Sequence, residues 1–115
     1  MFVFDHVGIT TTLPQPNENW VEQSRVWVTN PREHPEYIEF LRYEPDSPVP
    51  EVIKINPHIA FRVTSLAPYI AGLDIIIPPF VVGDFLEVVF VRKYNTIFEY
   101  MHYLREGWFA DASQR

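Results

Sequence analysis

The sequence of 115 residues contains no cysteine. This absence excludes disulfides, thiolate metal ligands and a cysteine nucleophile, so any metal site must use histidine and carboxylates. It also fits a reducing compartment. The sequence opens on the apolar, strand-like segment Met1–Phe4, without the basic region of a signal peptide. We therefore expect a cytoplasmic protein.

Positive charge is also scarce. Nine Lys and Arg stand against fifteen Asp and Glu, which gives a net charge of −6, and the basic residues are scattered along the chain. Such a surface would repel a phosphate backbone. No apolar run approaches the roughly 20 residues that a membrane-spanning helix needs. We expect neither nucleic acid nor a membrane as a partner.

Glycine is rare as well, with four residues, whereas proline occurs eleven times. Because proline cannot donate a hydrogen bond to a helix or a central strand, this composition favours short elements, mostly strands, joined by stiff loops. Hydrophobic residues make up 47% of the sequence and include nine Phe, which is ample for a packed core. The length fits one domain spanning residues 1–115.

Two pairs of short segments resemble each other. His6–Ile9 and His58–Phe61 each place a histidine before a β-branched, a small and a large apolar residue, whereas Tyr37–Tyr43 and Ile97–Tyr103 each place a glutamate between large apolar residues. All four segments are typical of strands. Histidine and glutamate strands alternate along the chain, which indicates a tandem duplication.

The duplication divides the chain into module one (about 1–44), a linker (45–50), module two (about 51–103) and a C-terminal tail (104–115) with a frayed end, in which Trp108 and Phe109 are candidates for docking. In module two we predict a helix over 65–71 and strands over 74–77 and 86–92, with turns at Pro78-Pro79 and at 93–95. Module one has a strand over 25–29, but the proline-containing stretch 11–24 leaves its helix reduced or absent.

Histidine and glutamate share a strand face with informative neighbours, because residues two apart point to the same side. His6 shares its face with Gly8, and His58 with Ala60, so small residues leave space beside each imidazole. A lone strand histidine or glutamate usually has a structural role. Recurrence at matching places in both halves instead favours one shared divalent-metal site, and a glutamate in so apolar a strand needs a partner.

These segments resemble the vicinal oxygen chelate superfamily, which includes glyoxalase I, methylmalonyl-CoA epimerase, extradiol dioxygenases and bleomycin-resistance proteins. The strands at 4–9 and 57–63 are similar to those that open the family's two βαβββ modules, and those at 37–41 and 97–101 to the strands that close them. The resemblance implies an α+β fold of two tandem modules in an open, barrel-like sheet, with the first module shortened because 11–24 replaces the usual helix and adjoining strand. It also implies that one divalent metal binds His6, Glu39, His58 and Glu99.

Two imidazoles and two carboxylates suit Ni, Co, Zn, Mn or Fe. A substrate with two neighbouring oxygens could chelate such an ion, and Glu39 or Glu99 would remove a proton to give a stabilised enediolate. The leading hypothesis is therefore a lyase or isomerase of the glyoxalase or epimerase type, acting on a small hydroxy-carbonyl or acyl-thioester substrate. Oxygenase chemistry ranks lower, because a fourth ligand crowds the positions that dioxygen needs.

Other hypotheses remain open. The trimmed module one also fits a non-catalytic protein of the same fold that binds or sequesters a small molecule, with Trp20, Trp27, Tyr43 and Tyr103 as candidates for stacking. A structural remnant in a larger assembly is a third reading. We predict Arg62, Tyr43 and Tyr103 as substrate-binding residues, although Arg62 could equally pair with a buried glutamate. Open sheet edges predict a homodimer.

The two remaining histidines are not predicted ligands. His34 lies in a proline-flanked turn and should be solvated. His102 should face away from Glu99, because it is an odd number of residues along the same strand.

Overall fold

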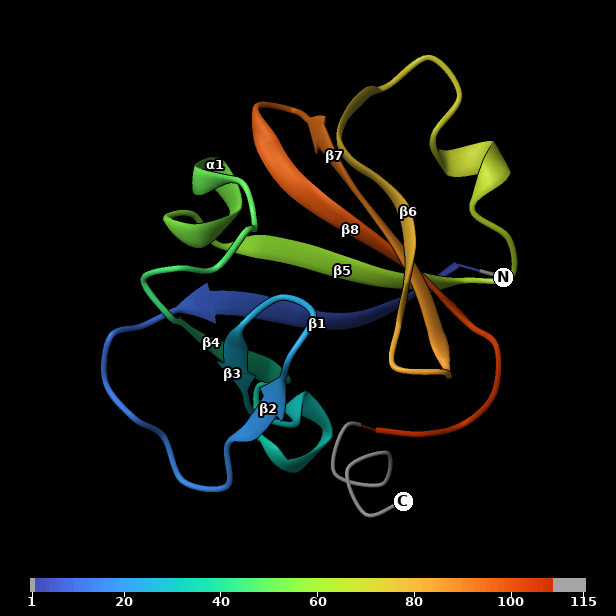
Figure 1. Cartoon of the computed structure of the whole chain (residues 1–115). Coiled ribbons are helices and arrows are strands. Elements are labelled where there is room, and N and C mark those ends of the chain that lie inside the picture. Colours follow the sequence, from blue (N-terminus) through green and yellow to red (C-terminus); the bar gives the residue numbers. More distant parts are fainter. Residues whose placement is uncertain (1, 109–115) are drawn as a thin grey trace.

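A curled, eight-stranded mixed sheet forms a half-barrel in the computed structural model, which describes residues 2–108 (Figure 1). The helical content of these residues is one α-helix of four residues, α1 (Glu51–Lys54), and two 3₁₀ turns at Pro31–Glu33 and Ala67–Tyr69. The fold is thus mostly β, which corrects the expectation of a clear α+β structure. The many prolines and the few long helical patterns account for this difference.

The strands run in the order β2-β3-β4-β1-β5-β8-β7-β6 across the sheet. Those of the first half are β1 (Phe2–Thr10), β2 (Asn19–Val21), β3 (Val26–Val28) and β4 (Ile38–Tyr43). Those of the second half are β5 (His58–Val63), β6 (Asp74–Val82), β7 (Leu86–Lys93) and β8 (Thr96–Tyr103).

Strand pairing follows the same scheme in each half. β1 pairs in parallel with β4, and β5 pairs in parallel with β8. The strands β3 and β2 then extend the first half by antiparallel pairing, as β7 and β6 extend the second. β1 and β5 pair antiparallel and join the halves. The two histidine strands are therefore neighbours at the centre of the sheet, and each is flanked by a glutamate strand.

Two hydrophobic clusters cover the two faces of the sheet. On β7, Val88 and Phe90 belong to the larger cluster, whereas Val89 and Val91 belong to the smaller one, as alternation along a strand requires. The larger cluster lies on the face that carries His6 and the other three predicted ligands. Leu66 packs on the opposite face, beside the Ala67–Tyr69 turn.

The helix predicted over 65–71 is reduced to the single 3₁₀ turn Ala67–Tyr69. Pro68 lies inside it, in what would be the first turn of the predicted helix, where proline is tolerated. Gly72 follows with φ +73°, a conformation that ends the turn. Leu66, Tyr69 and Ile70, whose spacing predicted the helix, do pack together in the smaller hydrophobic cluster, but they do so from one turn and its neighbours.

The turn predicted at Pro78-Pro79 is wrong, because β6 continues through both prolines to Val82. β6 lies at the edge of the sheet, where proline is tolerated, and its register with β7 shifts on either side of Ile77. The chain turns instead at Gly83, with φ +61°. The turn predicted after β7 is confirmed, and Tyr94 and Asn95 both have positive φ, as in a tight hairpin.

The first half has its strands, but two of them are short. β2 lies within the stretch 11–24 that was expected to lack a strand, and β3 lies within the strand predicted over 25–29. α1 follows the predicted linker directly. Trp108 in the tail is buried, whereas Phe109 lies outside the described residues. No helix within residues 2–108 is long and apolar enough to cross a membrane.

Candidate metal centre

Four buried polar side chains meet on one face of the sheet. His6 and His58 are each 2% exposed, and Glu39 and Glu99 are each 7% exposed. Each comes from a different central strand, in the order β4, β1, β5, β8. We call these four residues the His-Glu cluster. The structure therefore brings together all four ligands predicted from the sequence.

Strand register explains how residues from four strands can meet. Gly8 is the partner of Glu39 on one side and of His58 on the other. Ala60 is likewise the partner of His6 on β1 and of Glu99 on β8. Two rows thus cross the sheet, and each has a histidine and a glutamate on either side of a small residue. Next-neighbour strands lie roughly 9 to 10 Å apart, so the two long side chains must lean over the residue between them.

Gly8 is essential to this arrangement. A Cβ atom at this position would lie 2.1 Å from Cε1 and 2.3 Å from Nε2 of His58. The imidazole of His58 therefore lies directly over the backbone of β1. On its other side the ring meets the edge of Phe90, with ring centroids 5.3 Å apart. Glycine is thus needed at position 8, because the ring of His58 occupies the space that a side chain there would fill.

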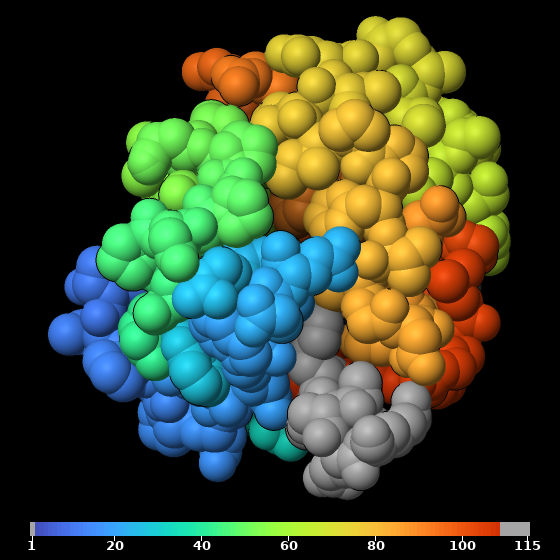
Figure 2. Space-filling model, in the orientation of Figure 1, coloured from blue at the N-terminus to red at the C-terminus, as the bar shows by residue number. Residues whose placement is uncertain are grey.

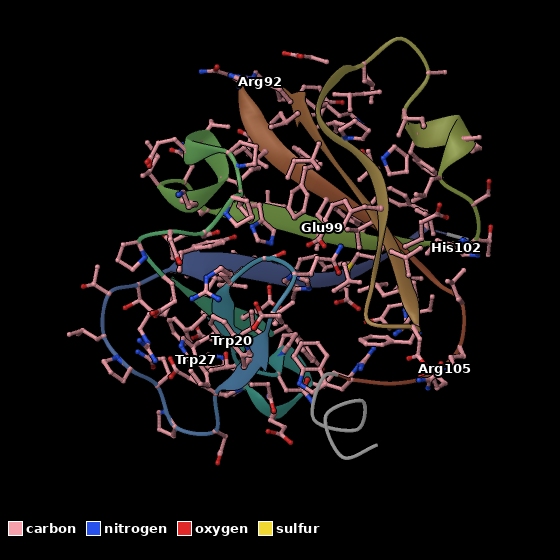
Figure 3. The ribbon with its side chains drawn as sticks, in the orientation of Figure 1. Trp20, Trp27, Arg92, Glu99, His102 and Arg105 are labelled. Carbon is pink, nitrogen blue, oxygen red and sulfur yellow. The ribbon has the colours of Figure 1, made fainter. Side chains whose placement is uncertain are left out.

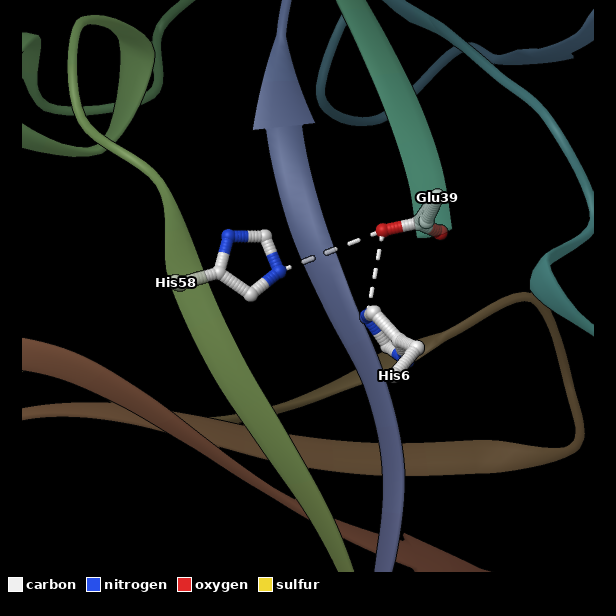
Figure 4. A group of neighbouring side chains, drawn as sticks. All are labelled: His6, Glu39 and His58. Atoms are coloured by element: carbon white, nitrogen blue, oxygen red, sulfur yellow. Dashed lines mark ion pairs between the residues drawn. The ribbon is translucent and has the colours of Figure 1, made fainter. Parts of the chain in front are cut away.

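Three histidine–carboxylate distances within the His-Glu cluster match those of ligands around one ion, and a fourth is slightly longer. Nε2 of His6 lies 3.3 Å from Oε1 of Glu39 and 3.5 Å from Oε1 of Glu99, and Nε2 of His58 lies 3.3 Å from Oε1 of Glu99. Nε2 of His58 and Oε1 of Glu39 are 3.9 Å apart (Figure 4). Ligand atoms about 2.0–2.2 Å from a zinc-like ion lie roughly 3.0–3.5 Å apart at ordinary coordination angles.

The imidazole nitrogens also lack the hydrogen bonds that buried polar atoms normally make. Nε2 of His6 and both ring nitrogens of His58 have no hydrogen-bond partner among the described residues. The carboxylate oxygens are near these nitrogens but are not positioned to accept a good hydrogen bond. Ligand atoms of His6, Glu39 and His58 all lie within 4.8 Å of one another, so the donor set fits a divalent metal.

A β-bulge brings a fifth polar residue to the site. Phe4 pairs with Phe61 and His6 with Ala60, so Asp5 is an extra residue on β1. Its Oδ2 lies 2.7 Å from Nδ1 of His6. Since an ionised carboxylate can only accept, Nδ1 of His6 carries a hydrogen, so Nε2 is the nitrogen that can present a lone pair to an ion once it has given up its proton. Alternation along a regular strand would have put Asp5 on the opposite face.

Arg62 and Tyr103 lie behind Asp5. A guanidinium nitrogen of Arg62 is 4.0 Å from Oδ1 of Asp5, and Cζ of Arg62 lies 4.0 Å from the ring centroid of Tyr103. The hydroxyl of Tyr103 accepts a hydrogen bond from Arg32. Neither Arg62 nor Tyr103 lines the cavity beside the cluster. The substrate-binding role of Arg62 and Tyr103 stays a prediction. In the structure Arg62 instead lies beside the carboxylate of Asp5, and the ring of Tyr103 packs against Arg62.

Tyr43 does line the cavity. Burial raises the pKa of its hydroxyl, and the negative charges of Glu39 and Glu99 raise it further. Tyr43 therefore stays protonated at physiological pH and can donate a hydrogen bond to an oxygen atom in the cavity. Of the three predicted substrate-binding residues, it is the one whose position fits that role.

Charge within the cluster is balanced by mutual contacts. Burial works against a charged His6, but the charge of Glu39 and the contacts with Asp5 and Glu99 outweigh it, so the pKa of His6 lies well above its ordinary value. Burial would also raise the pKa of Glu99, but its contacts with His58 and His6 prevail and lower this pKa to about 2. The metal-free site therefore holds a proton on imidazole and a charge on carboxylate.

A cavity of about 80 Å³ adjoins the cluster. Its wall combines aliphatic side chains of β3 and β4, such as Val26 and Leu41, with residues of β6 and β7 on the opposite side, such as Phe80 and Val88. Figure 2 shows the molecular surface hollowed between the β2–β3 turn, the segment around α1, and β6. Trp108, predicted from the sequence as a candidate for docking, also lines the cavity.

The other polar and aromatic candidates lie away from the cluster. Trp20 and Trp27 pack on each other with ring centroids 4.9 Å apart, and neither lines the cavity. Figure 3 shows this pair near β2 and β3, with Glu99 nearer the centre of the sheet. His102 contacts Glu87 at 3.5 Å on the other face of β8, and His34 accepts a hydrogen bond from the backbone N–H of Glu36.

Comparisons with known proteins give a fold and no function. No protein-family model matches the chain, and no curated protein matches it. Among solved structures, it is similar to that of a hypothetical protein of Bacillus halodurans C-125, BH1468, with a TM-score of 0.62. The two sequences are 17% identical, and the match covers 93% of this chain and 98% of the other. This likeness shows a shared fold alone.

Proposed function

We propose that this protein is a metal-dependent lyase or isomerase of the glyoxalase or epimerase type, which acts on a small hydroxy-carbonyl or acyl-thioester substrate. The observation that carries the proposal is the convergence of the His-Glu cluster beside a cavity. Nε2 of each histidine is buried without a hydrogen bond and close to carboxylate oxygens, as expected of ligands to Ni, Co, Zn, Mn or Fe.

The proposal extends to the architecture. The repeated pairing scheme supports two tandem βαβββ modules of the vicinal oxygen chelate type, over about 1–44 and 51–103, in one domain with the linker at 45–50. The first module is shortened, with strands β2 and β3 of three residues each and no helix between β1 and β2 in the described chain. The absence of cysteine supports a cytoplasmic location.

The reaction divides between the metal and the chain. A divalent metal held by the cluster would supply Lewis acidity, which stabilises negative charge developing on two neighbouring substrate oxygens. Glu39 or Glu99 takes the proton from the carbon beside them. In an isomerisation the same carboxylic acid returns the proton to the neighbouring carbon, whereas in an epimerisation the other glutamate, as its carboxylic acid, donates a proton from the opposite face. Tyr43, whose raised pKa keeps its hydroxyl protonated even at alkaline pH, donates a hydrogen bond to a substrate oxygen.

Elemental analysis of the purified protein, with Glu39→Gln and Glu99→Gln beside the parent, tests this proposal. Glutamine preserves shape and still offers an oxygen, so metal content and the melting temperature of the metal-loaded proteins should stay near those of the parent. Turnover of a hydroxy-carbonyl substrate should fall about 10²- to 10⁴-fold in the variant that has lost the base. Glu36→Gln, at an exposed position near Glu39 in sequence, is the matched control.

The same measurements can reject the proposal. Absence of metal from all four proteins, together with a stability loss of about 3–5 kcal/mol in Glu39→Gln, would make Glu39 a structural residue. The ion pairs of Arg62 in the described chain are with Asp5 and Glu106, so the structure does not give Glu39 that arginine as a partner.

A second candidate is a non-catalytic protein of the same fold that binds or sequesters a small molecule. The apolar wall of the cavity favours it, since such a wall can hold a ligand without metal chemistry. Ligand binding without metal in the purified protein, and no turnover after metal is added, would support this candidate over the enzyme.

A further inference from the structure

The wall of the cavity beside the His-Glu cluster is almost entirely apolar. Outside the cluster, its lining residues are aliphatic or aromatic except for Ser24 and Tyr43, and none of them is Lys or Arg. Apolar side chains come from both halves of the sheet, for example Leu41 of β4 and Val88 of β7. Any ligand that enters therefore meets polar atoms at one end, at the cluster, and hydrocarbon along its body.

Arg62, the cation predicted to bind the substrate, does not line the cavity. Its guanidinium lies on the ring of Tyr103 and faces Asp5 and Glu106. A phosphate or carboxylate on the body of a ligand would therefore be buried without a cationic partner. It would also approach Glu39 and Glu99, whose charges already balance those of a dication. Burying an unpaired charge is strongly unfavourable.

We infer that the cavity takes a small uncharged molecule with a short hydrocarbon body and two neighbouring oxygens at one end, and that it rejects molecules with a charged or strongly polar body. The oxygen-bearing end rests on the proposed function, whereas the hydrocarbon body rests on the wall alone. The size also constrains the ligand. An apolar cavity of about 150 Å³ holds benzene, so about 80 Å³ corresponds to a body of a few carbons.

Three compounds with the same hydroxymethyl-ketone head test this inference. They are 1-hydroxy-2-butanone, dihydroxyacetone and dihydroxyacetone phosphate, whose tails end in methyl, hydroxyl and phosphate. Their binding to zinc-loaded protein is measured by calorimetry and ligand-observed NMR. We expect the methyl compound to bind about 10- to 100-fold more tightly than the hydroxyl compound, because the wall is mostly hydrocarbon and has few hydrogen-bonding groups. The phosphate should not bind detectably.

A pair of variants checks that the wall sets this order. Ser24 is half-buried at the cavity, so a longer side chain is tolerated there. Ser24→Lys should give measurable binding of the phosphate compound, whereas Ser24→Met, of similar length without charge, should keep the order of the parent. Circular dichroism of both variants confirms that they fold.

The inference and the proposed function fail in different ways. Titration with zinc alone tests the metal site, and the tail order can then be measured with or without metal. If zinc does not bind, the proposed function fails, while a preference for the methyl tail in metal-free protein still supports the inference. Failure of 1-hydroxy-2-butanone to bind at millimolar concentration, or binding of the phosphate compound to the parent as tightly as the methyl compound, overturns it.

Discussion

Asp5 is the residue whose role in the metal site can be tested most sharply. It accepts a 2.7 Å hydrogen bond from Nδ1 of His6 and thereby makes Nε2 the nitrogen that binds an ion after losing its proton. In Asp5→Asn the side chain keeps its shape, but its amide group can donate to Nδ1 and favour the wrong tautomer of His6. The negative charge that makes the imidazole a better ligand is also lost.

The expected magnitude follows from the place of Asp5 one contact away from the ion. Changes to such outer partners of metal-binding histidines cost about 10- to 100-fold in metal affinity, or about 1.4–2.7 kcal/mol. We expect zinc affinity to fall by this factor. Because Asp5 also helps to raise the pKa of His6, its loss reduces competition by protons. The fall in affinity should therefore be clearest at alkaline pH, where protons do not compete.

Calorimetric zinc titration gives the affinity, and nitrogen-15 NMR of the histidine side chains gives the tautomer of His6 in metal-free protein. Asp74→Asn is the matched control, because Asp74 is exposed and pairs with Arg92 on β7. This control should bind zinc like the parent. An Asp5→Asn protein with the parent's affinity at alkaline pH and with Nδ1 still protonated would refute the role assigned to Asp5.

Three further predictions follow from the same site and surface. Gly8→Ala should lower zinc affinity by more than the 10–100-fold typical of a change in an outer partner of a metal-binding histidine, because the new Cβ would displace the ring of His58. Gly72→Ala is the control, since its Cβ would have no neighbour within 4 Å. It should cost about 1 kcal/mol of stability, because φ is positive at this position, and leave zinc affinity unchanged. The raised pKa of His6 stabilises the metal-free protein at low pH, so the melting temperature should fall as pH rises through that pKa. Zinc binding at a pH below that pKa should release a proton. Equal calorimetric heats in buffers of different ionisation enthalpy would contradict the proton release. The exposed segment Phe2–Phe4 and the free edge of β6 predict a homodimer, and a strictly monomeric mass by light scattering at micromolar concentration would contradict it.

The central part of the fold was predictable because its signal is local and repeated. His6 and His58 each precede a short alternating segment, and strand periodicity then fixes which neighbours share a face. The small residues Gly8 and Ala60 were recognised as space beside the imidazoles. The register adds that each small residue serves the histidine of the other strand, since Gly8 lies beneath His58 and Ala60 opposite His6. Which small residue lies beside which histidine depends on how β1 and β5 pair, and the sequence of one strand does not reveal that pairing.

The failures have physical causes of their own. Proline normally interrupts a sheet, yet Pro78 and Pro79 lie in β6 because an edge strand has one side without partners. Asp5 was not predicted beside His6 because strict alternation puts neighbouring residues on opposite faces, and the bulge that overrides alternation depends on pairing with β5. Arg62 has the parity of a cavity residue, but its contact with the ring of Tyr103 holds it elsewhere.

The shortened first half bears on how the cavity is closed. β2 and β3 have three residues each, whereas their counterparts β6 and β7 have nine and eight, so the first half contributes much less strand to the wall. Ile53 of α1 and Trp108 both line the cavity, and they are 1% and 8% exposed. Segments that follow β4 and β8 in the chain thus supply the apolar wall that short strands cannot. Although the strands of the first half are short, the four polar residues of the His-Glu cluster are therefore only 2–7% exposed.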